Sequence, residues 1–155
     1  MHLAMLPDTN VLVAAYRADH PHHATAVAWL EASLNEGKDR QPLLLPMPVI
    51  SGFVRLVTHA KIFSEASSSS QAIEFIDWLL DHSCVRVLSE TFEWPEFRSL
   101  VLDKELAGNH ISDAWLAGLS ISLSERFVTF DKGFRQLLPR SLLHILSGSP
   151  AKPQI

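Results

Sequence analysis

The sequence predicts an α/β protein, a three-layer α/β/α sandwich around a central, mainly parallel sheet. Two observations lead to this prediction. Short apolar runs of strand length alternate with longer stretches of helical period, and one or two helices separate each strand from the next. Strands that are joined through helices cannot pair as hairpins, so they are expected to run parallel, with helices covering both faces of the sheet.

The strands are predicted from short apolar runs bounded by turn residues. The run Leu43–Leu45, between Pro42 and Pro46, is apolar throughout, as suits a strand that is buried on both faces of a parallel sheet. The five expected strands are residues 3–6, 43–45, 85–88, 127–129 and 142–146.

The helices are predicted from apolar residues about one turn apart. A serine run over 67–70 is expected to cap one helix, and Pro95 to open another that ends at Gly108. In the last helix, apolar or small residues recur roughly one turn apart, at Ile111, Trp115, Gly118 and Ile121. The expected helices cover residues 10–16, 23–34, 48–58, a stretch after 70, a stretch from 95, and 112–122.

Composition limits the class of protein. The chain has 155 residues, enough for one domain, which we place over residues 1–146, with 147–155 as a flexible tail. A single cysteine, Cys84, excludes an internal disulfide, and no basic leader or membrane-length apolar run is present, so a cytoplasmic protein is expected. A net charge of -4 excludes nucleic-acid binding by bulk charge alone.

Three aspartates are expected at one edge of the sheet. Asp8 follows the first predicted strand, Asp131 follows the fourth, and Asp113 lies in the first turn of the helix that enters the fourth. Ligands of open parallel sheets bind beyond the carboxyl ends of the strands. Each aspartate alone is explained as a helix cap or turn former. Together they would repel one another unless a cation neutralised them.

The chemistry of this cluster favours Mg²⁺, with Mn²⁺ as an alternative. Both are hard cations that prefer carboxylate oxygens and retain water ligands. Such an ion would position water against a phosphodiester and stabilise charge on the phosphoryl oxygens.

The chain resembles PIN-domain proteins, specifically the VapC-type toxins of bacterial toxin–antitoxin pairs. The resemblance covers nearly the whole chain and rests on the order of several short motifs. They are Asp-Thr-Asn-Val-Leu from residue 8, Gly-Phe-Val-Arg at 52–55, Asn109 with Ser-Asp-Ala at 112–114, and Thr-Phe-Asp at 129–131.

This resemblance implies an Mg²⁺-dependent endoribonuclease that cuts tRNA, rRNA or mRNA, forms a homodimer and is silenced by a cognate antitoxin. The antitoxin typically reaches into the acidic pocket with a basic side chain. Carried over by position, Asp8, Asp113 and Asp131 are the metal-binding and catalytic carboxylates.

One position departs from the family pattern. The broad PIN pattern has a glutamate on the helix after the second strand, where this chain has Gly52. Three carboxylates remain rather than four, which argues against a second metal ion. The alternative function is therefore a catalytically degenerate PIN fold that binds RNA or a protein partner.

Other polar residues are given supporting roles. Asn10 either holds the Asp8 loop by hydrogen bonds or points toward the water ligands of the metal ion, and both roles stay open. Thr129 is expected to orient Asp131, and Asn109 belongs to the matched motif. Candidates for RNA contact are the cations that border the site: Arg55, Lys132 and Arg135.

Two further chemistries fit the sequence less well. A haloacid-dehalogenase-like phosphatase would use Asp8 as nucleophile and a second aspartate two residues later, where this chain has Asn10. A zinc site is suggested by His20, His22 and His23, but adjacent histidines without further spaced ligands favour surface or capping roles.

Overall fold

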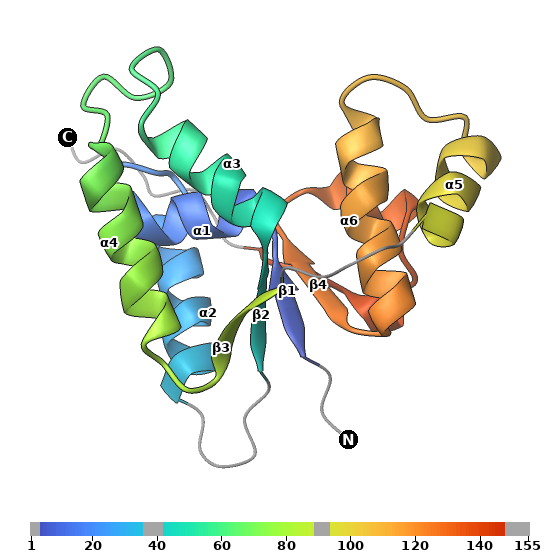
Figure 1. Cartoon of the computed structure of the whole chain (residues 1–155), viewed down its shortest axis with the longest axis horizontal. Coiled ribbons are helices and arrows are strands. Elements are labelled where there is room, and N and C mark those ends of the chain that lie inside the picture. The colour runs from blue at the N-terminus through green and yellow to red at the C-terminus, as the bar shows by residue number, and fades with distance from the viewer. Residues whose placement is uncertain (1–3, 36–41, 89–93, 148–155) are drawn as a thin grey trace.

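The centre of the molecule is a five-stranded parallel sheet. A computed structural model describes residues 4–35, 42–88 and 94–147 and gives the strand order β3-β2-β1-β4-β5 (Figure 1). All four neighbouring pairs are parallel, which confirms the predicted fold class. The strands are β1 (Met5–Pro7), β2 (Leu43–Pro46), β3 (Val85–Leu88), β4 (Arg126–Thr129) and β5 (Leu143–Ile145).

The helices lie close to their predicted positions. Ser68 caps α4 by accepting from the Gln71 backbone, while the Gln71 side chain accepts from the Ser68 backbone, which completes a capping box. The helices are α1 (Thr9–Tyr16), α2 (His23–Asn35), α3 (Met47–Val57), α4 (Ser69–Leu80), α5 (Trp94–Asp103) and α6 (His110–Leu123), with the 3-10 helices η1 (Lys132–Gln136) and η2 (Arg140–Leu142).

One local prediction differs from the structure. The helix that was expected to end at Gly108 ends at Asp103, and Gly108 instead lies in the following turn with a φ of 59°, a conformation that glycine adopts without strain. Trp115 of α6 packs against the buried cluster that contains Ala117 and Leu119, and with Ile111 it also lines a cavity between helices.

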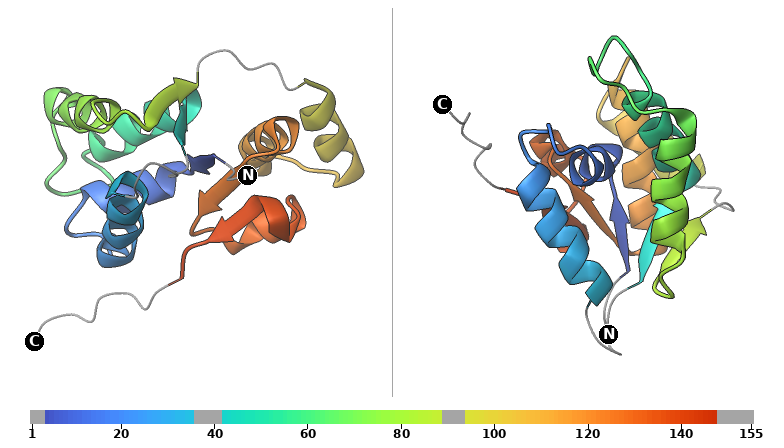
Figure 2. Two further views of the ribbon diagram at one scale, coloured as in Figure 1. Left: turned by 90° about the horizontal axis from the view of Figure 1, so that it is seen from below. Right: turned by 90° about the vertical axis from the view of Figure 1, so that its left-hand side faces the viewer.

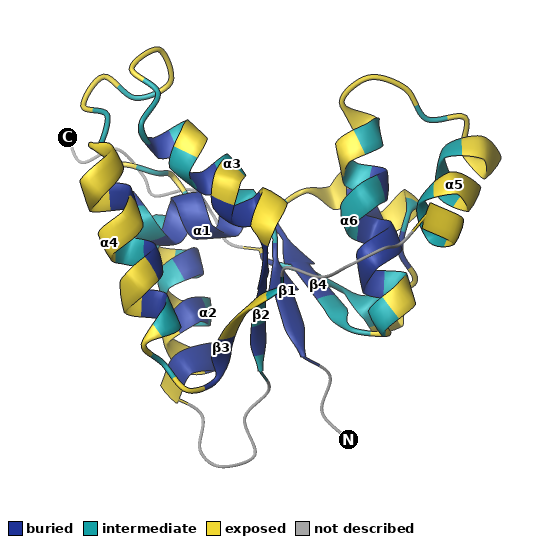
Figure 3. Ribbon diagram, in the orientation of Figure 1, coloured by how far each residue is buried: buried dark blue, intermediate teal, exposed yellow. Residues whose placement is uncertain are grey.

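Alternate residues of each strand bury against different helices. Met5 packs in a core with residues of α1, α2, α3 and α4, whereas the next residue, Leu6, packs with Phe127, Phe134 and Leu119 on the other face. Figure 2 shows α1 to α4 on one side of the sheet and α5 and α6 on the other, and Figure 3 shows the central strand β1 buried between them, whereas the edge strand β3 is partly exposed. The three-layer arrangement follows from this alternation.

The topology places a ligand site at the carboxyl ends of β1 and β4. From β1 the chain builds β2 and β3 on one side and then returns to build β4 and β5 on the other. The order of the strands therefore reverses between β1 and β4, and such switch points are where open α/β sheets bind ligands.

None of the helices in the described part of the chain combines the length and apolar character that a membrane crossing would require. The predicted tail falls on residues 148–155, which lie outside the described residues, as does Leu3 of the first predicted strand.

Arg17 fastens the end of α1 to the loop between α3 and α4. Its guanidinium forms a two-point ion pair with Asp19, at 2.6 and 2.9 Å, and donates to the Glu65 carbonyl at 2.8 Å. The same group lies 4.3 Å from the centre of the Phe63 ring. Because this arginine is buried and uses both charge and stacking, it holds the loop in one place.

We expect Arg17→Ala to lower the free energy of unfolding by about 2 kcal/mol, because the Glu65 carbonyl and the Phe63 ring lose their partner. Urea denaturation measures this change. Arg98→Ala, at an exposed position of α5, is the matched control and should change stability by less than about 0.5 kcal/mol. Equal effects of the two substitutions would contradict the fastening role.

Candidate active site

Asp8 connects β1 to α1 and also to β4. Its backbone is extended, and its Oδ1 accepts a hydrogen bond from the Thr9 backbone at 2.7 Å, so it is the N-terminal cap of α1. Its Oδ2 accepts from the Thr129 hydroxyl at 2.7 Å. The Asp8 backbone N–H also donates to the Val128 carbonyl at 2.8 Å. The carboxylate is therefore fixed from both sides of the switch point.

Thr129 is the centre of a hydrogen-bond network at the end of β4. Its hydroxyl, which is fully buried, accepts from the Asp131 backbone at 3.0 Å and from the Asn10 amide at 3.3 Å. The Asn10 carbonyl oxygen in turn accepts from the Phe130 backbone at 3.3 Å. Asn10 and Thr129 thus connect the loops that carry Asp8 and Asp131 by hydrogen bonds.

Asp131 is the exposed member of the aspartate set. Its Oδ1 accepts from the Gly133 backbone at 2.8 Å, which caps η1. A side chain at position 133 would bring a Cβ to 3.0 Å from that oxygen, a tight contact, so the turn favours glycine at this position. With one oxygen on the turn, the other remains available toward solvent.

Asp113 enters the site from the first turn of α6. Its Oδ2 lies 3.6 Å from Nδ1 of His110, one turn earlier, and the carboxylate is half-buried. Asn109, which precedes the helix, is exposed and forms no side-chain cap hydrogen bond. Asn109 forms part of the turn that leads into α6. Its side chain forms no described hydrogen bond with any of the three aspartates.

The three carboxylates interact electrostatically. Burial raises the pKa of Asp8 to about 6, against the lowering effect of the Thr129 and Thr9 hydrogen bonds, and the charges of Asp113 and Asp131 raise it further. Burial and the Asp131 charge also raise the pKa of Asp113, while His110 lowers it. The charges of Asp113 and Asp131 therefore make ionisation of Asp8 less favourable, and the charge of Asp131 does the same for Asp113.

The donor set fits a hard cation. Carboxylate oxygens that repel one another are stabilised by Mg²⁺ or Mn²⁺, and the residues that could hold such an ion are Asp8, Asp113 and Asp131. Within residues 4–35, 42–88 and 94–147, no three His, Cys, Asp or Glu side chains stand close enough to form a ready-made ligand cluster. Water ligands, which Mg²⁺ retains readily, would have to complete any coordination shell.

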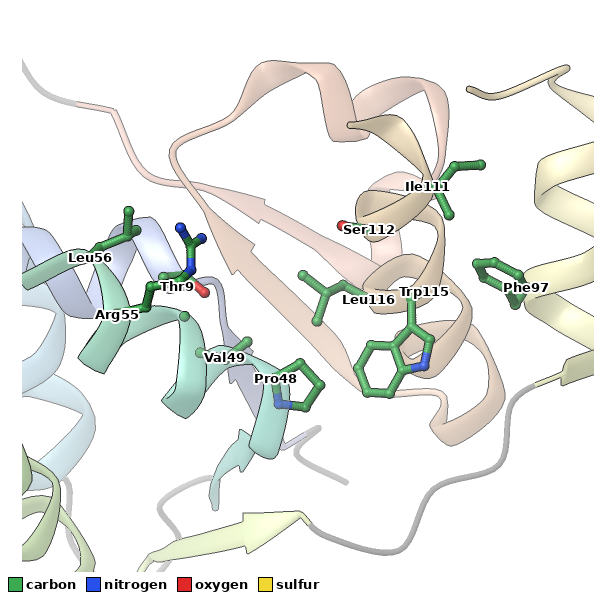
Figure 4. Close-up of a pocket in the computed structure, with 11 residues that line it drawn as sticks. Thr9, Pro48, Val49, Arg55, Leu56, Phe97, Ile111, Ser112, Trp115 and Leu116 are labelled. Atoms are coloured by element: carbon green, nitrogen blue, oxygen red, sulfur yellow. The ribbon is translucent and has the colours of Figure 1, made fainter. Parts of the chain in front are cut away.

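Two cavities, each of about 510 Å³, flank the aspartates. One is mostly apolar and lies between α3 and α6, with Gly52, Arg55, Thr9 and Trp115 in its lining (Figure 4). A Cβ at position 52 would lie 3.0 Å from the Thr9 Oγ1. Position 52 therefore adjoins the Asp8 loop, and an acidic side chain there would have to displace Thr9.

The second cavity contains polar residues that the sequence did not single out. Asp113 and Asp131 line it together with Lys104, Glu105 and His110. Glu105 has a φ of 49°, in the left-handed region. The sequence contains no motif that marks these residues. They come beside η1 only because of the turn between α5 and α6.

The predicted RNA-contacting cations occupy different places. Arg55 is exposed on α3 and lines the apolar cavity, whereas Lys132 and Arg135 are exposed on η1, directly after Asp131. All three border the site on the side of the strand ends.

The histidine cluster has structural contacts instead of a ligand geometry. His20 Nδ1 accepts from the His22 backbone, and His23 Nδ1 lies 2.8 Å from the Ala14 carbonyl. The His22 ring stacks on Phe130, with ring centres 4.7 Å apart.

Asn10, with both ends of its amide in hydrogen bonds, is also unsuited to the acid–base role that the phosphatase alternative needs.

The comparison with known proteins agrees with this arrangement. The family model of the PIN domain matches residues 5–137, and the chain belongs to this family. Ribonuclease VapC43 of Mycobacterium tuberculosis is 36% identical to it over 142 residues, which are 91% of this chain and 95% of the relative.

Solved structures share the fold at lower identity. The crystal structure of VapBC2 from Rickettsia felis, bound to a DNA fragment from their promoter, contains a chain with a TM-score of 0.65 and 18% identity. The match covers 94% of this chain and all of that one. Mycobacterium tuberculosis VapC20, described as a sarcin-ricin loop cleaving toxin, has a TM-score of 0.60 and 17% identity over 86% of this chain and 94% of its own.

Asp8→Asn should make the protein more stable at pH 7. The folded-state pKa of Asp8 lies above its ordinary value of 3.8, so the folded state binds a proton that the unfolded state releases between pH 4 and 6. The stability of the wild type therefore falls as the pH rises through this window. A shift of about two pKa units corresponds to about 3 kcal/mol, and asparagine loses one acceptor, worth about 1 kcal/mol.

The net gain of about 2 kcal/mol at pH 7 should disappear below pH 4, where wild-type Asp8 is protonated in both states. Urea denaturation at several pH values measures it. Asp77→Asn, at an exposed position of α4, is the control and should change stability by less than about 0.5 kcal/mol. A destabilised Asp8→Asn at pH 7 would contradict the interpretation.

Thr129→Val should raise the pKa of Asp8 above about 6, because the lost hydroxyl stabilises the ionised carboxylate. Carbon-detected NMR titration of the Asp8 carboxyl group measures this change. Thr58→Val removes a hydroxyl that bonds only to backbone carbonyls at the end of α3, so it should leave the Asp8 titration unchanged. An unchanged Asp8 pKa in Thr129→Val would show that the hydroxyl does not control it.

Proposed function

We propose that this protein is a metal-dependent endoribonuclease of the VapC type, the toxin of a toxin–antitoxin pair. The observation that carries the proposal is the fixed position of Asp8. Hydrogen bonds from Thr9 and Thr129 hold its carboxylate, and the charges of Asp113 and Asp131 raise its pKa. The similarity to a protein named ribonuclease VapC43 supports RNA as the substrate.

In the proposed reaction, Asp8, Asp113 and Asp131 hold Mg²⁺, with Mn²⁺ as a substitute. When bound, the ion would supply Lewis-acid chemistry, polarising the phosphodiester and favouring ionisation of water. Thr129 and Asn10 keep the carboxylate loops in place while RNA binds. Lys132 and Arg135 on one side and Arg55 on the other offer charge to the phosphates that flank the cleaved bond.

The proposed partners are RNA, a cognate antitoxin and a second copy of the chain. The likeness to a chain of the VapBC2 structure supports an antitoxin as a partner. Two tryptophans, Trp78 and Trp94, are about half exposed and are candidates for a homodimer contact.

A second candidate function is a binding module without catalytic activity. Gly52 favours it, because the usual glutamate of the family is missing and the position adjoins Thr9. The three remaining carboxylates would then serve only to bind a cation or a basic side chain of a partner.

Cleavage of cellular RNA with Mg²⁺ and with EDTA tests the proposal. Asp8→Asn and Asp113→Asn should each lower the cleavage rate by at least about 100-fold, while Asp77→Asn should cleave as the wild type does. Because Asp8→Asn is expected to be the more stable protein, unfolding would not explain its loss of activity. Cleavage that survives both substitutions would contradict the assignment, and absence of any cleavage by the wild type would favour the binding module.

Metal binding has a readout that is independent of activity. Mg²⁺ should raise the thermal unfolding midpoint of the wild type, because a ligand of the folded state stabilises it, and should raise that of Asp8→Asn much less. Differential scanning calorimetry over a series of Mg²⁺ concentrations measures both. Equal shifts for the two proteins would place the ion elsewhere.

A further inference from the structure

Positive charge is concentrated in the last part of the described chain. Residues 126–147 contain four Lys or Arg and one Asp or Glu, whereas the whole chain has 13 basic and 17 acidic residues. This segment forms β4, η1, η2 and β5, at the edge of the sheet opposite β3 (Figure 2). A protein with a net negative charge thus has one basic edge.

A groove of about 630 Å³ lies along this edge, and we call it the β5-edge groove. Arg135 and Arg140 line it, over a floor that Leu138, Leu143 and Ile145 provide. Both arginines are exposed, and neither forms an ion pair with another residue of the described ranges. Their guanidinium groups are therefore available to a ligand.

The 3-10 helix η1 links the aspartate site to the groove along the chain. Asp131 caps η1, and Arg135 lies on the same short helix, four residues later. At about 2 Å per residue in a 3-10 helix, the backbone of Arg135 lies about 8 Å from that of Asp131 along the helix. A strand whose phosphodiester lies at Asp131 reaches Arg135 within a few nucleotides, passing Lys132.

The lining suits a phosphodiester backbone. Guanidinium groups bind phosphate oxygens in a two-point geometry, and the leucine and isoleucine floor offers apolar surface to ribose and base faces. Because β5 is an edge strand, one side of it faces the groove instead of another strand. The two arginines lie on successive 3-10 helices, Arg135 on η1 and Arg140 on η2.

We propose that the β5-edge groove binds the backbone of the RNA substrate on one side of the cleaved bond, through Arg135 and Arg140. This inference rests on the proposed ribonuclease function. It adds Arg140, which lies beyond the aspartate loops, and it gives the RNA a direction of exit from the site, along η1 to the outer edge of the sheet.

The test measures RNA binding to the cleavage-deficient Asp8→Asn protein by fluorescence anisotropy, with an end-labelled single-stranded RNA and with pooled tRNA, over a series of salt concentrations. Arg140→Gln should weaken binding about 5-fold at 0.1 M salt and should reduce the slope of log affinity against log salt by about 0.7, because one phosphate contact is lost. Arg140→Lys should restore most of both.

Arg86→Gln is the matched control, because Arg86 is an exposed arginine on β3, the opposite edge of the sheet. It should change neither the affinity nor the slope. An unchanged affinity and slope in Arg140→Gln, or equal losses in Arg86→Gln, would overturn the proposal. The proposal would also be overturned if Arg140→Gln lost binding to a co-purified acidic protein partner while its RNA binding stayed intact.

Failure of the groove and failure of the proposed function are distinguishable. Wild-type protein that cleaves RNA, together with Arg140→Gln that binds RNA normally, would overturn the groove alone. Wild-type protein that cleaves no RNA would overturn the ribonuclease function, while salt-dependent binding through Arg140 would still support the groove.

Discussion

The hydrogen bond from the Thr129 hydroxyl to Asp8 is the contact on which the site depends. It joins the ends of β1 and β4, the two strands at which the order of the sheet reverses. The same hydroxyl accepts from the Asp131 backbone, so a single buried oxygen sets the relative positions of two of the three carboxylates. Because a buried hydroxyl with several partners cannot move without leaving some of them unpaired, the loops have little freedom.

The fixed position of the Asp8 carboxylate destabilises the folded state at neutral pH. Burial and neighbouring charge raise the pKa of Asp8, so ionisation of this carboxyl group is less favourable in the folded protein than in the unfolded chain. A site of this kind is less stable empty than it would be with a neutral side chain, and a divalent cation relieves the repulsion. The tension between stability and function is common where charge is gathered for catalysis.

The surroundings of the aspartates divide into an apolar and a basic side. On the apolar side, Gly52 and Thr9 line a cavity between α3 and α6. On the basic side, η1 leads from Asp131 to Arg135 and the sheet edge. The net charge of -4 therefore describes the average of the chain, and the part beside the site has the opposite sign. Local charge, and not the total, governs contact with a polyanion.

The sequence by itself determined the parallel α/β fold, the family and the placement of three aspartates at strand and helix ends, because periodicity and short motifs are local properties. It also indicated that Thr129 orients Asp131. Only the tertiary structure decided that Asn10 hydrogen-bonds to Thr129 and Phe130, that Lys104 and Glu105 adjoin the site, and that Arg140 shares a groove with Arg135. These facts depend on which elements pack side by side, and spacing along the chain does not encode that packing.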